Sequence, residues 1–168
     1  RGPAPAATHP RRLTRCDGPA PPACPDRVLL LSMHTSPVDQ PGSGDAGGMN
    51  VYVRQLSRAM VGEGAAVHVV TRSDTGEAWE ARDEGVVVAG LPVGPPDAAK
   101  EDLPALVPDF ARAVAQHLAA RELTPDVVHS HYWLSGMVAL ALPGRTATWA
   151  HTMHTLGATK NAELAGTD

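Results

Sequence analysis

The amino-acid sequence predicts an α/β domain built on an open, mostly parallel sheet with helices on both faces. Short continuous apolar runs, typical of strands buried on both sides, recur along the chain. These runs alternate with segments whose apolar residues have helical spacing, which favours parallel strands joined by helices. Polar residues and glycines gather directly after several runs, where sheets of this class bind ligands.

The composition restricts the kind of partner. The 168 residues are 43% hydrophobic, 19% charged and 4% aromatic, as in an ordinary folded domain. A formal charge of −4 argues against a nucleic-acid partner, which would favour a basic surface. No apolar run approaches the ~18 residues that a membrane-spanning helix needs. We therefore expect a soluble, cytoplasmic protein that binds small molecules.

Residues 1–27 differ from the rest of the chain. They contain seven of the 16 prolines and both cysteines, and they carry an excess of positive charge. Their few apolar residues cannot offset the entropy cost of ordering the backbone, so we expect a disordered extension. The spacing of Cys16 and Cys24 does not fit a zinc-binding pair. The remaining chain has no cysteine, which is compatible with the cytoplasm.

The first half of the folded part predicts three strands and one helix. Residues 28–33 (VLLLSM) form a short apolar run, as expected of a central strand. In residues 48–64 apolar side chains recur every three to four positions and the segment ends in glycines, so a helix is predicted. Residues 66–71 and 86–91 are rich in valine and predict two further strands.

The second half continues the alternation. Apolar residues from Leu103 to Leu118 lie on one helical stripe, and Pro108 indicates that the regular helix starts late. Residues 126–131 then predict a strand, residues 133–142 a short helix and residues 146–151 a last strand. The sequence shows no internal repeat.

Histidines are concentrated at the predicted strand ends. The five at strand ends are His34, His129, His131, His151 and His154. A metal site is one interpretation, but no carboxylate or cysteine adjoins these histidines in the sequence, and we predict no metal ligand in this chain. Imidazoles grouped with hydroxyl and amine side chains favour hydrogen bonds to a sugar or a phosphate. His68 and His117, within a strand and a helix, are predicted to be structural.

The loop after the first strand has three interpretations. Gly42, Gly44 and Gly47 formally match a dinucleotide fingerprint, but eight residues separate them from the strand, which is unusual for such a site. The loop could also be a simple connector with glycines at the helix start. Alternatively, small residues let backbone N–H groups approach an anion at the helix N-terminus. Asp45 would repel a phosphate placed against it, but it suits a ligand rich in hydroxyl groups.

These residues leave two function classes open. One is a transferase acting on a phosphorylated, hydroxyl-rich substrate. The other is a nucleotide-binding module such as an oxidoreductase domain. An interaction domain without chemistry would leave the polar strand ends unexplained.

Several motifs together resemble one group of enzymes. The motifs are SMHTSP with QPGSGDAGGMN (32–50), KEDLP (100–104), HSHYWLSG (129–136) and HTMHTL (151–156), followed by Lys160 and Asn161. They resemble retaining glycosyltransferases with two facing Rossmann-like domains, the GT-B fold. Within that fold they are most similar to the actinobacterial D-inositol-3-phosphate glycosyltransferases of mycothiol biosynthesis, which transfer N-acetylglucosamine from UDP-N-acetylglucosamine to 1D-myo-inositol 3-phosphate.

The resemblance implies a role for each matching residue. The implied contacts to inositol phosphate are His34, Asp45, Ala46, Gly47, Gly48, Met49, Asn50, Lys100, Tyr132 and Thr155. Gln40, Pro41 and Gly48 would contact UDP-N-acetylglucosamine, and His154 would be the catalytic residue beside the donor sugar. Lys100 would bring a cation, and Tyr132 and Thr155 hydroxyl groups, to the acceptor phosphate.

The resemblance also implies a division of labour. Residues 28–168 would form an incomplete N-terminal, acceptor-binding Rossmann-like domain. The C-terminal donor domain is expected to lie outside this chain. That domain would supply the cations that neutralise the diphosphate and any Mg²⁺ ligands. The full-length enzyme is expected to be a homodimer. Since no carboxylate pair is in view, the resemblance favours a front-face mechanism, and we expect residues 1–168 alone to be inactive. An alternative is a sucrose-phosphate-synthase-like glycosyltransferase, although Lys100 and Tyr132 favour an acceptor with a phosphate.

Overall fold

The strands form a single six-stranded sheet in a computed structural model that describes residues 25–39, 47–144 and 146–155. The strands are β1 (Arg27–Leu31), β2 (Ala66–Arg72), β3 (Trp79–Asp83), β4 (Val86–Leu91), β5 (Val127–His131) and β6 (Thr148–Thr152). The helices are α1 (Gly48–Gly62), the 3₁₀ turn η1 (Leu103–Leu106), α2 (Val107–Ala120) and α3 (Tyr132–Ala141). The sheet order is β3-β4-β2-β1-β5-β6, and every neighbouring pair is parallel except β3 and β4. The predicted α/β class is confirmed.

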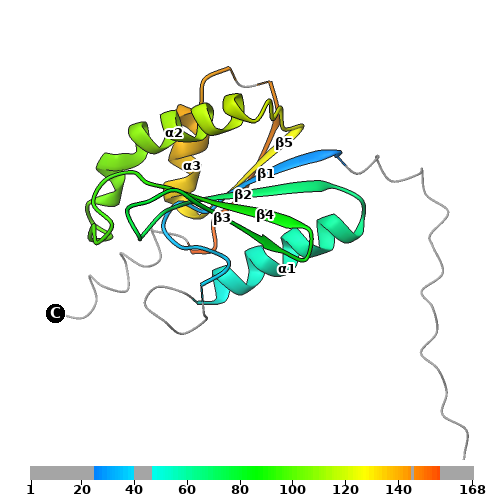
Figure 1. The fold of residues 1–168 in the computed structure, drawn as a ribbon, viewed down its shortest axis with the longest axis horizontal. Coiled ribbons are helices and arrows are strands. Elements are labelled where there is room, and N and C mark those ends of the chain that lie inside the picture. Colours follow the sequence, from blue (N-terminus) through cyan, green and yellow to red (C-terminus); the bar gives the residue numbers. More distant parts are fainter. Residues whose placement is uncertain (1–24, 40–46, 145, 156–168) are drawn as a thin grey trace, which may run out of the picture.

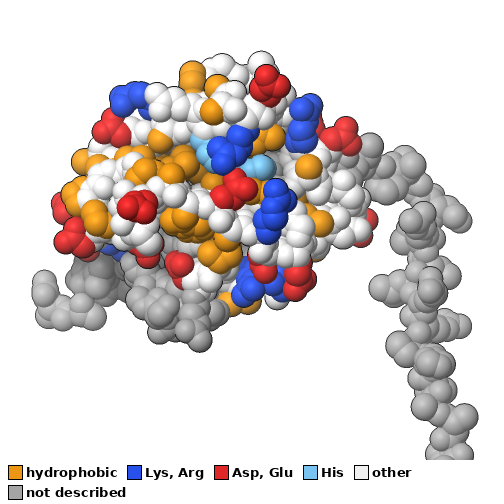
Figure 2. Space-filling view, in the orientation of Figure 1, with side chains coloured by type: hydrophobic (Ala, Val, Ile, Leu, Met, Phe, Trp, Pro, Cys, Tyr) orange, Lys and Arg blue, Asp and Glu red, His pale blue; other side chains and the backbone are white. Residues whose placement is uncertain are grey.

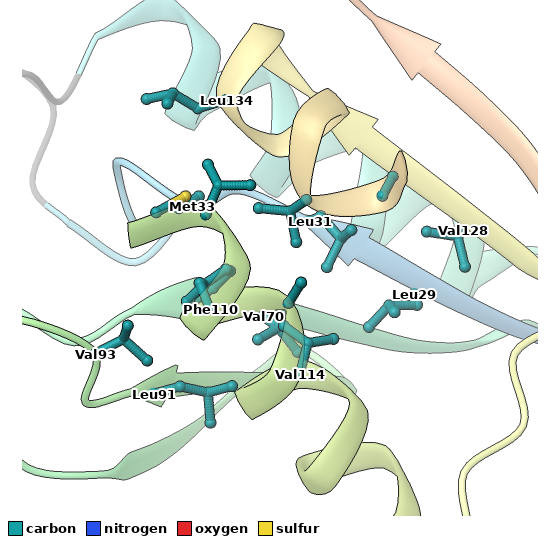
Figure 3. Packing of buried hydrophobic residues seen from close by; sticks show 14 of the residues in the cluster. Leu29, Leu31, Met33, Val70, Leu91, Val93, Phe110, Val114, Val128 and Leu134 are labelled. Atoms are coloured by element: carbon teal, nitrogen blue, oxygen red, sulfur yellow. The ribbon is translucent and has the colours of Figure 1, made fainter. Parts of the chain in front are cut away.

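The core has two halves because β1 is buried on both faces. Val28 and Leu30 pack into a cluster on the side of α1, whereas Leu29 and Leu31 pack on the opposite side. In the second cluster Phe110 of α2 is fully buried against the sheet (Figure 3). Each such apolar side chain contributes about 1.5–3 kcal/mol relative to exposure. The continuous apolar run that predicted β1 therefore has a direct physical reason.

Helices cover both faces of the sheet. Helices α2 and α3 lie on one side and α1 on the other (Figure 1). Helix α1 is also tied to the β3–β4 hairpin, because Nε of Arg54 donates to Asp83 over 2.9 Å and Arg58 donates to the same carboxylate. These hydrogen bonds hold the pKa of Asp83 well below its usual range. The two ion pairs hold α1 against the β3–β4 hairpin.

Strand β3 was absent from our sequence interpretation. Its five residues, WEARD, lie at the sheet edge and are mostly polar, so they lack the apolar run that marks a central strand. Glu84 and Gly85 join β3 to β4 with φ values of 48° and 88°. Two consecutive left-handed residues between paired strands are typical of a tight hairpin, and the glycine was the signal that we missed.

The remaining boundaries follow from local chemistry. Pro108 lies in the first turn of α2, where its missing N–H costs no hydrogen bond, as the sequence predicted. Strand β5 runs into α3 with no loop between them, and Tyr132 turns the chain with a φ of 69°. Among the described helices none is long and apolar enough to cross a membrane. Positive and negative side chains are interspersed over the face drawn in Figure 2, unlike the uniformly basic face of a nucleic-acid binder.

Candidate functional site

The predicted site residues that the structure describes belong to segments at the carboxyl ends of β1, β4, β5 and β6 and at the start of α1. The predicted contacts of Gln40, Pro41, Asp45 and Ala46 lie outside the described residues. The others are brought to this end of the sheet because parallel strands all finish at the same edge.

An aromatic and cationic group joins three of these segments. The ring of His34, after β1, lies 4.5 Å from the ring of Tyr132 between centroids. Nζ of Lys100, in the segment after β4, lies 5.9 Å from the centroid of the same tyrosine ring. The fold thus brings together three residues that are far apart in the sequence, since 66 positions separate His34 from Lys100 and 32 separate Lys100 from Tyr132. A cation, a phenol hydroxyl and an imidazole in one place suit a phosphate or a polyol.

Asn50 ties the loop after β1 to helix α1. Its side chain is 2% exposed, and its amide nitrogen donates to Oγ1 of Thr35 and to the backbone oxygen of Ser36. Ser32 adds a hydrogen bond of 2.7 Å to the backbone oxygen of Thr35. Oδ1 of Asn50 is buried and has no hydrogen-bond partner among the described residues. Its amide nitrogen is therefore committed to the protein, and its oxygen is buried, so the implied contact of Asn50 to inositol phosphate stays a prediction.

Two glycines form the N-terminus of α1. Gly47 is the N-cap in an extended conformation, and no side chain of the described residues makes a capping hydrogen bond to the helix. Gly48 is exposed, and a Cβ atom built on it meets nothing within 4 Å. Met49 is half-buried and packs against the cluster on the α1 side of the sheet. Among the described residues no side chain caps the first backbone N–H groups of the helix, which is compatible with an anion site.

Three histidines and one tyrosine form a cluster beside this helix. His129 and His131 point to the same face of β5, with 4.2 Å between ring centroids. Nδ1 of His131 lies 3.1 Å from Nε2 of His154, which follows β6. The ring of Tyr52, on α1, meets the ring of His154 edge-on at 5.2 Å. His131 had no assigned role in our sequence interpretation, and Tyr52 was only one of the apolar positions of the predicted helix.

Burial lowers the pKa of all three histidines. For His131, which is 0% exposed, burial is the main cause and the neighbouring histidines add to it, so that its pKa falls to about 3. Burial also lowers the pKa values of His129 and His154, and nearby His151 acts in the same direction. The cluster is therefore neutral near pH 7 and provides hydrogen-bonding atoms rather than charge. Within the described part of the chain, no group of three or more His, Cys, Asp or Glu side chains is placed to hold a metal ion.

Residues on β6 complete this end of the sheet. Nδ1 of His151 lies 2.8 Å from Oγ of Ser130, and Nε1 of Trp149 donates to the same hydroxyl over 2.9 Å. Nε2 of His129 lies 2.8 Å from Oγ1 of Thr152 on the opposite face. His154 follows with a φ of 60°, and Thr155 is exposed. Left-handed backbone at His154 and at Tyr132 places two strained non-glycine residues at the candidate site.

The two histidines predicted to be structural lie elsewhere. His68 is in the middle of β2 and His117 is on α2, with 6.0 Å between their ring centroids. Nδ1 of His117 lies 3.1 Å from a nitrogen of Arg121, which in turn donates to Glu80 over 2.8 Å. This group of His68, His117, Arg121 and Glu80 joins α2 to the sheet, in keeping with a structural role.

Comparisons with known proteins agree with the geometry. Residues 47–167 match a family described as a glycosyl transferase 4-like domain. A protein of Kribbella flavida named D-inositol 3-phosphate glycosyltransferase is 51% identical over 148 residues, which cover 84% of this chain and 35% of that protein. A protein of Stackebrandtia nassauensis with the same name is 44% identical over 167 residues, covering 96% of this chain and 38% of that protein. The chain thus spans about a third of the length of these curated relatives.

Solved structures show the same architecture. Sucrose-phosphate synthase from Thermosynechococcus elongatus has a TM-score of 0.73 and 31% identity, and the match covers 85% of this chain and 37% of that chain. The catalytic domain of starch synthase IV from Arabidopsis thaliana has a TM-score of 0.56 at 17% identity and shares the fold alone. The resemblance drawn from the motifs is confirmed by these matches.

Proposed function

Because this chain belongs to the glycosyl transferase 4-like family, we propose that it forms the acceptor-binding part of a retaining glycosyltransferase. The donor would be UDP-N-acetylglucosamine and the acceptor 1D-myo-inositol 3-phosphate, as in the first step of mycothiol biosynthesis. The name of the Kribbella flavida relative supports this acceptor. We also propose that the protein is located in the cytoplasm and that the full-length enzyme is a homodimer.

The observation that carries the proposal is the grouping of Lys100, Tyr132 and His34 at the carboxyl end of the sheet. The three residues come from separate segments, and the tyrosine ring lies within 6 Å of both partners, at 4.5 Å from the His34 ring and 5.9 Å from Nζ of Lys100. In our proposal Lys100 and the hydroxyl of Tyr132 bind the acceptor phosphate, and Thr155 approaches it from the end of β6. In the same proposal the N–H groups at Gly47 and Gly48 face the ring hydroxyls, and Asn50 holds Thr35 and Ser36 of the neighbouring loop.

The chemistry asked of this chain is mainly positioning. Retention by a front-face route needs the acceptor hydroxyl held close to the anomeric carbon while UDP departs on the same side. In this proposal His154 lies beside the donor sugar, and its neutral ring donates or accepts a hydrogen bond there. Gln40, Pro41 and Gly48 are proposed to contact the donor. The residues that stabilise the departing diphosphate, and any Mg²⁺, are proposed to belong to the donor domain implied by the resemblance.

A second candidate is favoured by the structural similarity to sucrose-phosphate synthase. It would place another phosphorylated sugar against Lys100 and Tyr132. The dinucleotide alternative is weaker, because the family match favours a glycosyltransferase and the loop is too long for a tight phosphate turn.

The candidates can be separated by ligand-induced stabilisation of the 168-residue chain. Thermal unfolding is followed with 1D-myo-inositol 3-phosphate, fructose 6-phosphate, UDP-N-acetylglucosamine or NAD added in turn. A ligand present at 100 times its dissociation constant stabilises the folded state by about 2.7 kcal/mol. We expect the largest shift with inositol 3-phosphate. A larger shift with fructose 6-phosphate would favour the second candidate, and a shift with NAD alone would overturn the glycosyltransferase proposal.

A further inference from the structure

His131 and His154 form a contact between two histidines in different environments. The two rings lie 5.3 Å apart between centroids, and Nδ1 of His131 lies 3.1 Å from Nε2 of His154. His131 ends β5 and is 0% exposed, so its position is fixed by the sheet. His154 has a φ of 60° and only partial burial. A rigid, buried imidazole thus contacts a strained, accessible one.

The surroundings keep His131 neutral. The ring of His129 lies 4.2 Å away and the ring of Tyr52 lies 6.0 Å away, and both are polar groups without a charge that would favour an imidazolium. Burial together with His129, His154 and His151 lowers the pKa of His131 to about 3. A neutral imidazole carries one N–H, so only one nitrogen of His131 is a donor.

The surroundings of Nε2 of His131 indicate which of the two ring nitrogens carries the proton. Nε2 of His131 is buried without a hydrogen-bond partner among the described residues. If Nε2 carried the proton, an N–H donor would be buried without an acceptor, which is rarer in proteins than an acceptor left without a donor. The favoured tautomer therefore has the proton on Nδ1, which donates it to Nε2 of His154. Nε2 of His154 must then be the acceptor, and the proton of neutral His154 must be on Nδ1.

We propose that His131 is a positioning residue that fixes the ring and the tautomer of His154, so that His154 presents its Nδ1–H to an oxygen of the bound ligand. The proposal deepens the proposed function, on which it rests for the presence of a hydroxyl or phosphate oxygen at that place. No proton is transferred in this role. The hydrogen bond selects one of two neutral forms of His154 and holds its ring against rotation.

The tautomer can be measured directly by NMR. Long-range ¹H–¹⁵N correlation spectra of the ligand-free 168-residue chain at pH 7.5 distinguish a protonated Nδ1 from a protonated Nε2. We expect His154 in the Nδ1–H form and His131 in the Nδ1–H form. His131→Asn keeps a donor near the position of Nδ1 and should preserve the His154 tautomer. His131→Phe removes the donor, and His154 should then change to the Nε2–H form.

Two controls make the experiment decisive. His129→Phe changes the other ring neighbour of His131 without touching the hydrogen bond, so His154 should keep its tautomer. Should His131→Phe fail to fold, the wild-type and His131→Asn spectra still decide. An Nε2–H form of His154 in the wild type, or an unchanged tautomer in folded His131→Phe, would overturn the inference. Titration with inositol 3-phosphate tests the proposed function separately, because the tautomer is read without ligand.

Discussion

The molecule contains two pairs of histidines that look alike in chemistry and differ in place. His131 with His154 and His68 with His117 have ring centroids 5.3 and 6.0 Å apart. Burial is the first cause of a lowered pKa in all four residues. In both pairs a buried Nε2 has no hydrogen-bond partner among the described residues.

The surroundings separate the two pairs. His131 and His154 lie at the carboxyl ends of β5 and β6, where His154 has left-handed backbone and the tyrosine of α1 packs edge-on. His68 and His117 lie in regular backbone between β2 and α2, beside the ion pair of Arg121 and Glu80. A lowered pKa therefore does not identify a site by itself. What separates the candidate site from the structural pair is its position at the carboxyl ends of the parallel strands.

The largest effect is expected at the candidate site. Gly48→Val should abolish binding of inositol 3-phosphate, because a branched side chain would block the approach of a ligand to the first N–H groups of α1. The helix should still form, since a Cβ at Gly48 meets nothing within 4 Å in the ligand-free structure. Calorimetric titration measures binding and circular dichroism measures helix content. Normal affinity in a folded variant would show that the loop is only a connector.

The next largest effect is expected from lowering the pH, which should reduce the free energy of unfolding as the buried histidines are protonated. A histidine with a lowered pKa in the folded state stabilises the protein fully above its usual pKa of about 6.5, and this stability is lost as the pH falls. For His131 the loss should extend from about pH 6.5 to about 3. Asp83, whose pKa is also lowered, should add a loss only below its usual value of 3.8. Urea unfolding between pH 7.5 and 4.5 measures the trend.

The source of that trend can be assigned by substitution. In His131→Asn the free energy of unfolding should depend less on pH between 6.5 and 4.5 than in the wild type, because the most strongly shifted histidine is gone. An equally steep dependence in the variant would contradict the assignment to His131.

The smallest effect is expected at the structural pair. His117→Leu removes a buried nitrogen without a partner and loses the contact to Arg121, so the two changes offset each other. We expect the free energy of unfolding to change by less than about 1 kcal/mol, with unchanged affinity for inositol 3-phosphate. Chemical unfolding and calorimetry measure both quantities. Loss of binding would mean that the two pairs are coupled across the sheet.

The sequence predicted the buried parts of the fold better than its edge. Strand β1 could be predicted because it is buried on both faces and reads as one apolar run. Strand β3 could not, since an edge strand needs no such run and its Trp79 covers Gly90 only after the hairpin has formed. Short-range chemistry, such as Pro108 at the start of α2, was equally clear.

For the candidate site the sequence predicted which segments lie near one another, but it did not predict their contacts. The rule that parallel strands end at one edge placed His34, Tyr132 and His154 together. The hydrogen bond between His131 and His154 joins residues 23 positions apart, and it depends on the register of β5 and β6 and on the left-handed backbone of His154. Tyr52 contacts the cluster because of the way α1 is oriented about its own axis. Neither feature has a local sequence signal.

The central claim is that this edge of the sheet recognises an inositol phosphate through its phosphate. A thermodynamic cycle tests it by comparing 1D-myo-inositol 3-phosphate with myo-inositol, each titrated into the wild-type chain and into Lys100→Ala. Removing one charge-assisted hydrogen bond costs ~1.5–3 kcal/mol, so we predict a ten- to hundredfold loss of affinity for inositol 3-phosphate. The affinity for myo-inositol should stay the same. Equal losses for both ligands, or no loss for either, would contradict the account.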